Sequence, residues 1–377
     1  MDAGVALLRA AGHEVDVLEE DNRRITAMSK LALARDAIWS ESAFRALRTR
    51  LRDKRYDVVH VENFFPLLSP AIHHAAHQAG VGVVQSLRNF RLNCLNATFF
   101  RDGRVCEDCL GSRTFLPGIR HACYRRDRGA SAVVAASVIV HRLLRTWTRR
   151  VDVFVTPSAF ARDKIAEGGL PRDRIVVKPN FVPIELGPGS GTGRFALYVG
   201  RLSPEKGIDT LLAAWRDGAT MPLKIIGDGP LAPDVRHLAS HCPDVAYLGR
   251  QPLDAVYRMM GEAALVVVPS AGYETFGRTV IEAYARGTPV VATRLGAVAE
   301  LVQDGVTGTL VPPGDPVSLR CAVDDLARSP ERLSAMRSAA WRAYAARFKP
   351  EQNLSGYEAI YARAIAQAAD RRRRATG

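Results

Sequence analysis

The chain has 377 residues, of which 47% are hydrophobic and 24% are charged, a composition typical of globular proteins that excludes a largely disordered chain. Its length exceeds that of one typical domain, so two domains are expected. The formal net charge of +13 favours anionic partners such as nucleotide diphosphates, acidic lipid surfaces or nucleic acid. The alternative is that the arginines simply occupy solvated faces.

Two further exclusions concern membranes and secretion. The longest mostly apolar run, 132–140, is far shorter than the roughly 20 residues that span a bilayer, and it predicts a buried helix. The first residues lack a basic leader and a long apolar core, so they do not resemble a secretion signal. A cytoplasmic location is therefore expected, where thiols stay reduced.

Strand and helix patterns alternate along the whole chain, which predicts an α/β protein with parallel sheets. In the first half the expected strands are 13–18, 57–61, 81–86, 151–156 and 175–178. The glycine-rich stretch 187–193 has no apolar periodicity and predicts a linker. The second half alternates from 195 to about 327, and helices are expected at 330–347 and 351–369. These patterns predict domains at 1–186 and 187–350.

Four of the six cysteines fall within one segment of the first half: Cys94, Cys106, Cys109 and Cys123. The spacing of Cys106 and Cys109 is that of a zinc knuckle. In a reducing compartment, a structural zinc site held by these four cysteines is the favoured interpretation. A redox pair and a set of packed thiols are the alternatives, and His121 could replace one ligand.

Two carboxylates in the second half, Glu274 and Glu282, stand eight positions apart. The run 264–269 reads as a buried strand and 279–285 as a helix, so Glu274 lies in the intervening turn and Glu282 just inside the helix. Both can face one ligand at the carboxyl end of a parallel strand, the usual binding crevice of such sheets. Carboxylates there accept hydrogen bonds from the vicinal hydroxyls of a sugar or a ribose.

The run 269–289 resembles the signature of retaining, nucleotide-sugar-dependent glycosyltransferases of family 4, which have the GT-B fold. A block at 198–207 agrees, and further matches follow in the family's order at 225–230, 247–250, 287–293, 300–308 and 312–315. The resemblance implies two Rossmann-like domains whose parallel sheets face a central cleft. It also implies that the last helix, 351–369, packs back on the first domain.

The resemblance further implies a site for a nucleoside diphosphate sugar, the donor. Arg201 and Lys206 would hold the phosphates, which suits a bidentate guanidinium and a compact ammonium on a turn that leads to a helix start. Glu282 would bind the ribose, and Glu274 would face the donor sugar. The other expected donor-site residues are Gly200, Arg250, Thr275, Phe276 and Gly277.

The chemistry implied is glycosyl transfer in which Arg201 and Lys206, rather than a metal, stabilise the leaving group. No Asp-x-Asp motif occurs in the chain, so no catalytic metal is expected. Two carboxylates could also indicate a glycoside hydrolase, but a hydrolase would not need a phosphate clamp. A phosphorylase of the same fold would carry a pyridoxal-phosphate lysine, for which no motif is found.

The run 63–70, followed by the cysteine segment, resembles a subgroup associated with bacterial exopolysaccharide and other surface-glycan assembly. The acceptor implied is a glycan or a lipid-linked precursor, and an anionic inner-membrane surface is a further candidate partner. Nucleic acid is not expected, because no recognised binding motif accompanies the basic residues.

The chain departs from this subgroup in its first half. Where the subgroup has His-Asn, this chain has Glu62-Asn63, and where it has His-Asn-Tyr-Arg, this chain has Arg-Asn-Phe-Arg at 88–91. Arg88 thus replaces a histidine that lies beside the reacting sugar, and it cannot accept a proton. Arg88 is nevertheless kept as a candidate catalytic residue.

A larger departure is that Met1 falls inside the helix that follows the family's first strand. We therefore expect the first strand of the N-terminal domain to be missing and the chain as written to be a poor enzyme or an unstable protein. The alternative function is that of a catalytically impaired homologue that still binds a nucleotide sugar or a membrane partner.

Overall fold

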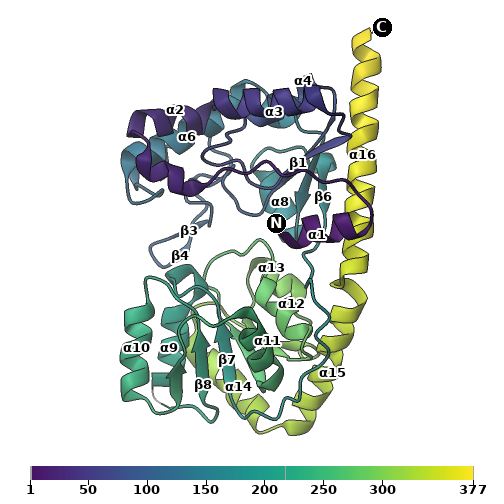
Figure 1. Cartoon of the computed structure of the whole chain (residues 1–377). Coiled ribbons are helices and arrows are strands. Elements are labelled where there is room, and N and C mark those ends of the chain that lie inside the picture. Colours follow the sequence, from purple (N-terminus) through teal and green to yellow (C-terminus); the bar gives the residue numbers. More distant parts are fainter. Residues whose placement is uncertain (1, 217, 377) are drawn as a thin grey trace. The chain divides into compact units, whose positions relative to one another are not determined.

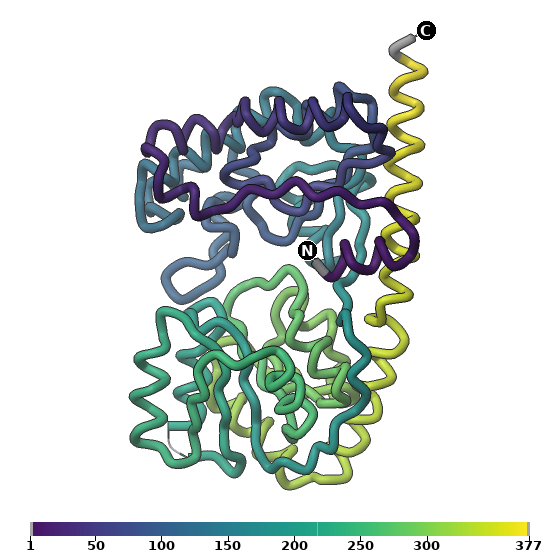
Figure 2. The backbone as a smooth tube through the Cα atoms, in the orientation of Figure 1, coloured from purple at the N-terminus to yellow at the C-terminus, as the bar shows by residue number. Residues whose placement is uncertain are grey.

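The computed structural model describes residues 2–216 and 218–376, and its residues divide into two compact units (Figure 1). The first unit comprises the chain up to Ala97, residues 107–178 and residues from Leu354 onward. The second comprises residues 98–106 and 179–353. The backbone trace shows that each unit is assembled from separate stretches of the chain (Figure 2).

The first unit is built on a four-stranded parallel sheet in the order β1-β2-β5-β6. Its strands are β1 (Val58–Val61), β2 (Gly82–Ser86), β5 (Val153–Thr156) and β6 (Ile175–Val177). Helix α16 (Pro350–Thr376) packs Ile360 and Ala364 against this sheet. A Cβ at Gly82 would lie only 3.0 Å from the Ala364 backbone, so glycine there lets the helix approach the strand.

The prediction of a strand at 13–18 is wrong, because these residues form no strand and β1 ends the sheet on that side. The segment is held by side chains instead. Asp16 accepts hydrogen bonds from Lys54 Nζ at 2.8 Å and from Tyr56 OH at 2.6 Å, and Arg50 donates to the Val17 carbonyl at 3.0 Å. The alternating pattern was present, but a strand also needs a neighbour with which to pair.

Further helices belong to the first unit. The apolar run 132–140 lies in α6 (Arg128–Leu143), where Val134, Ala135 and Val138 are buried, so the buried helix expected there is confirmed. Among the described residues, no helix combines the length and the apolar character needed to cross a bilayer. The other helices are α1 (Asp2–Ala10), η1 (Asn22–Ala27), α2 (Lys30–Ile38), α3 (Glu41–Asp53), α4 (Ala71–Gln78), α5 (Leu116–Arg120), α7 (Thr146–Arg149), α8 (Ala159–Glu167) and η2 (Arg172–Arg174).

A short hairpin interrupts the cysteine segment and groups with the second unit. Strands β3 (Phe100–Arg101) and β4 (Arg104–Val105) pair antiparallel across a two-residue turn. Both turn residues, Asp102 and Gly103, have positive φ, at 52° and 77°, as the Asp-Gly turns of tight hairpins require.

The second unit contains a six-stranded parallel sheet with a core on each face. Leu197 and Val266 enter one core, whereas Ala196 and Val267 enter the other, because successive side chains of a strand point to opposite faces. In sheet order the strands are β12 (Gly308–Val311), β11 (Val290–Thr293), β10 (Leu265–Val268), β7 (Ala196–Val199), β8 (Leu223–Ile226) and β9 (Val245–Tyr247).

The helices of this unit follow the predicted alternation. The helix expected at 330–347 is confirmed as α15 (Pro330–Arg347), and that expected at 279–285 is α12 (Arg278–Tyr284). The others are η3 (Pro204–Lys206), α9 (Ile208–Arg216), α10 (Ala232–His241), α11 (Leu253–Glu262), α13 (Gly296–Leu301) and α14 (Pro316–Ala327).

Buried histidines should make the first unit sensitive to acid. Burial lowers the pKa of His73, which is fully buried, to about 4, and burial likewise lowers the pKa of His60 to about 4. The unfolded chain binds these protons near pH 6.5, so it binds more protons than the folded chain between pH 6.5 and 4. The free energy of unfolding therefore falls as the pH drops through this window, by up to about 1.4 kcal/mol per pH unit for each histidine.

Urea unfolding at pH 7 and pH 5 measures this loss, and NMR should show the His73 imidazole still neutral at pH 5. His73→Gln should reduce the pH dependence, whereas the exposed His241→Gln, in the second unit, should leave it unchanged. Equal pH dependence in both variants, or protonation of His73 at pH 6, would contradict the prediction.

Candidate functional site

Three loops of the second unit meet at the carboxyl edge of its sheet. They follow the neighbouring strands β10, β7 and β8, whose parallel arrangement brings their ends to one edge. The amides of Ala271 and Gly272, after β10, donate to the carbonyl of Glu205, after β7, at 3.0 and 2.9 Å. The β7 and β10 loops are therefore fixed to each other by their backbones.

Glycines allow these loops to come this close. Gly207 has φ of 72°, and a Cβ there would lie 1.8 Å from the Pro269 carbonyl oxygen. A Cβ at Gly227, which follows β8, would lie 1.9 Å from the Gly200 carbonyl oxygen. Real Cβ atoms do not approach to these distances, so only glycine fits either position.

Two of the predicted donor residues contact each other across these loops. Lys206 Nζ lies 3.0 Å from Glu274 Oε1, and Ser270 Oγ donates to the same oxygen at 2.5 Å. The side chains of Lys206 and Glu274 are 31% and 17% exposed. Arg201 is exposed on the same turn, and its carbonyl accepts a hydrogen bond from Tyr198 OH at 2.9 Å.

Glu282 lies in α12 and is paired with an arginine that sequence reasoning missed. Arg278 Nε donates to Glu282 Oε1 at 2.7 Å, and Glu282 is only 9% exposed. Burial raises the pKa of this carboxyl group, although Arg278 opposes the rise. The signal was available, because residues four apart on a helix are neighbours.

The other predicted donor residues range from exposed to buried. Arg250 is 82% exposed on its side chain and forms an ion pair with Asp228 at 3.2 Å. Phe276 is buried in the core, and Gly277, with φ of 102°, precedes the first residue of α12. Thr275 is half-buried between Glu274 and Phe276.

In the first unit, the two departures from the subgroup lie side by side. Arg88 donates to both carboxylate oxygens of Glu62, from Nε at 2.5 Å and from Nη2 at 3.1 Å. His60 bonds to Ser86 Oγ and to Tyr361 OH, each at 2.9 Å. Sequence reasoning recorded both departures but missed that the new side chains form an ion pair.

These groups perturb one another because they are largely buried. Burial would raise the pKa of Glu62, but the hydrogen bonds from Arg88 and the nearby positive charges outweigh it and lower the pKa to about 2. Burial, together with Arg88, lowers the pKa of Lys178 to about 7. Lys178 Nζ lies 3.7 Å from the centre of the Tyr357 ring. Strongly perturbed groups of this kind gather at functional sites.

The predicted zinc site is not supported. Within residues 2–216 and 218–376, no group of three or more His, Cys, Asp or Glu side chains is arranged to hold a metal ion. Cys109 and Cys123 instead pack in an apolar cluster with Phe115 and Val134, and Cys94 Sγ lies 3.1 Å from Asn96 Oδ1. Of the four cysteines, Cys106 alone belongs to the segment that groups with the second unit. The spacing suggested a ligand set, but no such set is arranged within the described ranges.

Models of known protein families match both halves of the chain. The model described as "Glycosyl transferase 4-like domain" matches residues 5–180, and the model described as "Glycosyl transferases group 1" matches residues 193–329. The two matches place the chain among the GT-B glycosyltransferases. The subgroup defined by the cysteine segment is not shown by them.

Relatives and solved structures agree with this family. An uncharacterized glycosyltransferase of Methanocaldococcus jannaschii is 28% identical over 62% of this chain and 66% of its own length. A D-inositol 3-phosphate glycosyltransferase of Acidothermus cellulolyticus is 31% identical over 64% of this chain and 57% of its own. The chain thus spans less than two thirds of either relative.

Two solved structures share the fold. HepE of Anabaena in complex with UDP-glucose aligns with a TM-score of 0.65, at 18% identity, over 96% of this chain and 89% of that one. Sucrose-phosphate synthase from Thermosynechococcus elongatus aligns with a TM-score of 0.64, at 19% identity, over 98% and 92%. The fold is therefore GT-B, as the sequence predicted.

Proposed function

We propose that this glycosyltransferase moves a sugar, with retention at the anomeric carbon, from a nucleoside diphosphate sugar to a surface-glycan or lipid-linked acceptor. The observation that carries the proposal is the contact between Lys206 and Glu274 across the loops that follow β7 and β10, with Arg201 on the β7 loop and Glu282 on α12, the helix that follows the β10 loop. Cations for a diphosphate and carboxylates for hydroxyls are the groups that such a donor needs. The complex of HepE with UDP-glucose supports the choice of donor.

Each residue has a proposed role. Lys206 and Arg201 bind the diphosphate and stabilise the charge that develops as its bond to the anomeric carbon breaks. Glu282 accepts hydrogen bonds from the ribose hydroxyls. Ser270 and Lys206 both contact Oε1 of Glu274, so Oε2 is the oxygen that we assign to the donor sugar. The backbone at 275–277 and Arg250 border this site.

A catalytically impaired homologue is the second candidate, and one observation favours it. Arg88 occupies the place of the subgroup's histidine and is bound to Glu62 through both carboxylate oxygens, so it offers no proton acceptor. On either proposal, the protein works in the cytoplasm, where its arginine-rich surface suits an anionic membrane that carries the acceptor.

A panel of nucleotide sugars tests both candidates by thermal stabilisation. A donor present at 100 times its dissociation constant should add about 2.7 kcal/mol to the free energy of unfolding. Any donor that stabilises is then assayed for transfer and hydrolysis. Binding with turnover supports the enzyme, binding without turnover supports the impaired homologue, and no binding by any donor contradicts both.

Glu282→Gln should weaken the binding of the bare nucleotide, because Glu282 is assigned to the ribose. Glu300→Gln offers a control carboxylate in the same unit, on α13, and should bind the nucleotide like the wild type. Equal affinities of the two variants would contradict the ribose assignment.

A further inference from the structure

We propose that the first unit contains an anion subsite, in which Arg91 and Arg88 bind a phosphate or carboxylate group carried by the acceptor. The inference rests on the proposed transfer function and deepens it, because it specifies the chemical class of the acceptor. It concerns a cavity wholly within the first unit, at the carboxyl ends of β1 and β2.

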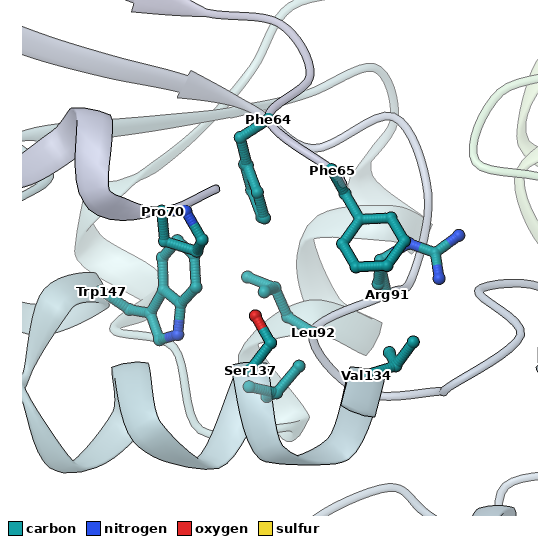
Figure 3. Close-up of a pocket in the computed structure, with 9 residues that line it drawn as sticks. Phe64, Phe65, Pro70, Arg91, Leu92, Val134, Ser137 and Trp147 are labelled. Carbon is teal, nitrogen blue, oxygen red and sulfur yellow. The ribbon is translucent and has the colours of Figure 1, made fainter. Parts of the chain in front are cut away.

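The cavity is lined by polar groups from two loops. One loop follows β1 and contributes Glu62 and Asn63, and the other follows β2 and contributes Arg88, Asn89 and Arg91. An adjoining, more apolar pocket shares Phe64, Phe65, Arg91 and Leu92 with this cavity. Figure 3 shows the Arg91 guanidinium beside the Phe65 ring, with Trp147 on the other side of this second pocket. An anion next to an apolar group would fit such a lining.

The positive charges around the cavity exceed the negative ones. Arg88 is neutralised by Glu62, but among the described residues Arg91 contacts no carboxylate. Its guanidinium lies over the Phe65 and Tyr124 rings, with centroids at 4.6 and 5.2 Å, and it donates to the Leu95 carbonyl at 3.1 Å. Burial lowers the pKa of Arg91 because it disfavours the charged guanidinium. A bound anion would stabilise that charged form.

Burial also affects a second basic group near this pair. Lys178, directly after β6, is 8% exposed, and Arg88 lowers its pKa while Glu62 raises it. Because Glu62 is engaged by Arg88, Arg91, on the same loop as Arg88, contacts no carboxylate among the described residues. A buried charge without full compensation is costly, and an oxyanion that accepts hydrogen bonds from guanidinium groups would offset that cost.

An unpartnered donor borders the second pocket. Trp147 Nε1 is buried and has no hydrogen-bond partner among the described residues, although buried polar groups are normally paired. It lines the pocket together with Leu92 and Val138. A polar atom of a bound molecule, or a water beside it, would satisfy this group. In the part of the chain that the structure describes, no carboxylate pairs with Arg91 and no acceptor pairs with Trp147 Nε1.

Binding of three monosaccharides to the full chain tests the subsite: glucose 1-phosphate, glucuronate and neutral glucose. Calorimetry should detect glucose 1-phosphate or glucuronate but not glucose, and the stronger of the two identifies the anion. Arg91→Gln should weaken that binding about tenfold or more, and Arg91→Lys less, because lysine keeps the charge. Arg347→Gln removes a guanidinium that lies over Phe348 in the second unit and should change nothing.

The outcomes separate this inference from the proposed function. Loss of binding in Arg91→Gln, with UDP affinity unchanged, supports the subsite even if no transfer is found. Loss in Lys206→Ala but not in Arg91→Gln would show that the sugar phosphate occupies the donor site, which overturns the subsite and leaves the proposed function intact. Equal binding of glucose and its charged analogues would also overturn it, and circular dichroism of Arg91→Gln excludes misfolding as the cause of a loss.

Discussion

Replacing Lys206 with alanine is expected to weaken UDP binding by about tenfold to a hundredfold, which corresponds to the roughly 1.5–3 kcal/mol of a charge-assisted hydrogen bond. Arg201→Ala should cost a similar amount, because the two cations share the charge of one diphosphate. Titration calorimetry measures both. Arg328→Ala, an exposed arginine on the same unit that pairs with Asp325, should bind UDP like the wild type.

The structure adds a second variant with an effect of the opposite sign. Lys206 is paired with Glu274 at 3.0 Å. A bound diphosphate must therefore share Lys206 with a carboxylate that is also negatively charged. Glu274→Gln removes this competitor, and UDP should bind as tightly or more tightly, while sugar transfer falls. Wild-type UDP affinity in both Arg201→Ala and Lys206→Ala would contradict the assignment of these cations to the phosphates.

Weaker UDP binding in Glu274→Gln would contradict only the idea that Glu274 competes with the diphosphate for Lys206.

Gly207→Ala is expected to have the largest effect on stability. A Cβ at this position would lie 1.8 Å from the Pro269 carbonyl oxygen, so either the β7 loop or the β10 loop must move. The free energy of unfolding should fall by about 3 kcal/mol or more, since steric overlap adds to the strain of a left-handed residue. Because this movement shifts the loops around the proposed phosphate-binding cations Arg201 and Lys206, nucleotide binding should weaken as well.

Gly305→Ala is the matched control for backbone strain. Gly305 also has a positive φ, of 76°, but a Cβ there would meet no atom within 4 Å. This variant should lose only about 1–2 kcal/mol, the cost of the left-handed conformation, and it should keep nucleotide binding. Chemical denaturation of the two variants compares the losses, and equal losses would show that the close approach at Pro269 does not limit stability.

The sequence by itself predicted the fold of the second unit. Buried runs such as 265–268 identify their strands because a strand with both faces covered is apolar throughout, and glycine at 207 or 277 marks a left-handed turn that other residues avoid. The two glutamates were singled out by their spacing, and the two cations by the resemblance of their motif to that of a known family. Their neighbours at Ser270 and Arg278 were overlooked, although each stands four positions before the glutamate that it contacts.

Only the tertiary structure decided what depends on contacts between distant segments. The pattern at 13–18 indicated a strand, but pairing requires a neighbour, and side chains of Lys54 and Tyr56 hold this segment instead. The spacing of the cysteines suggested a metal site, yet Cys109 and Cys123 pack in the apolar cluster around Phe115. Glu62 and Arg88 lie 26 positions apart, and no local rule pairs them. Their contact arises because β1 and β2 are adjacent parallel strands that end at the same edge of the sheet.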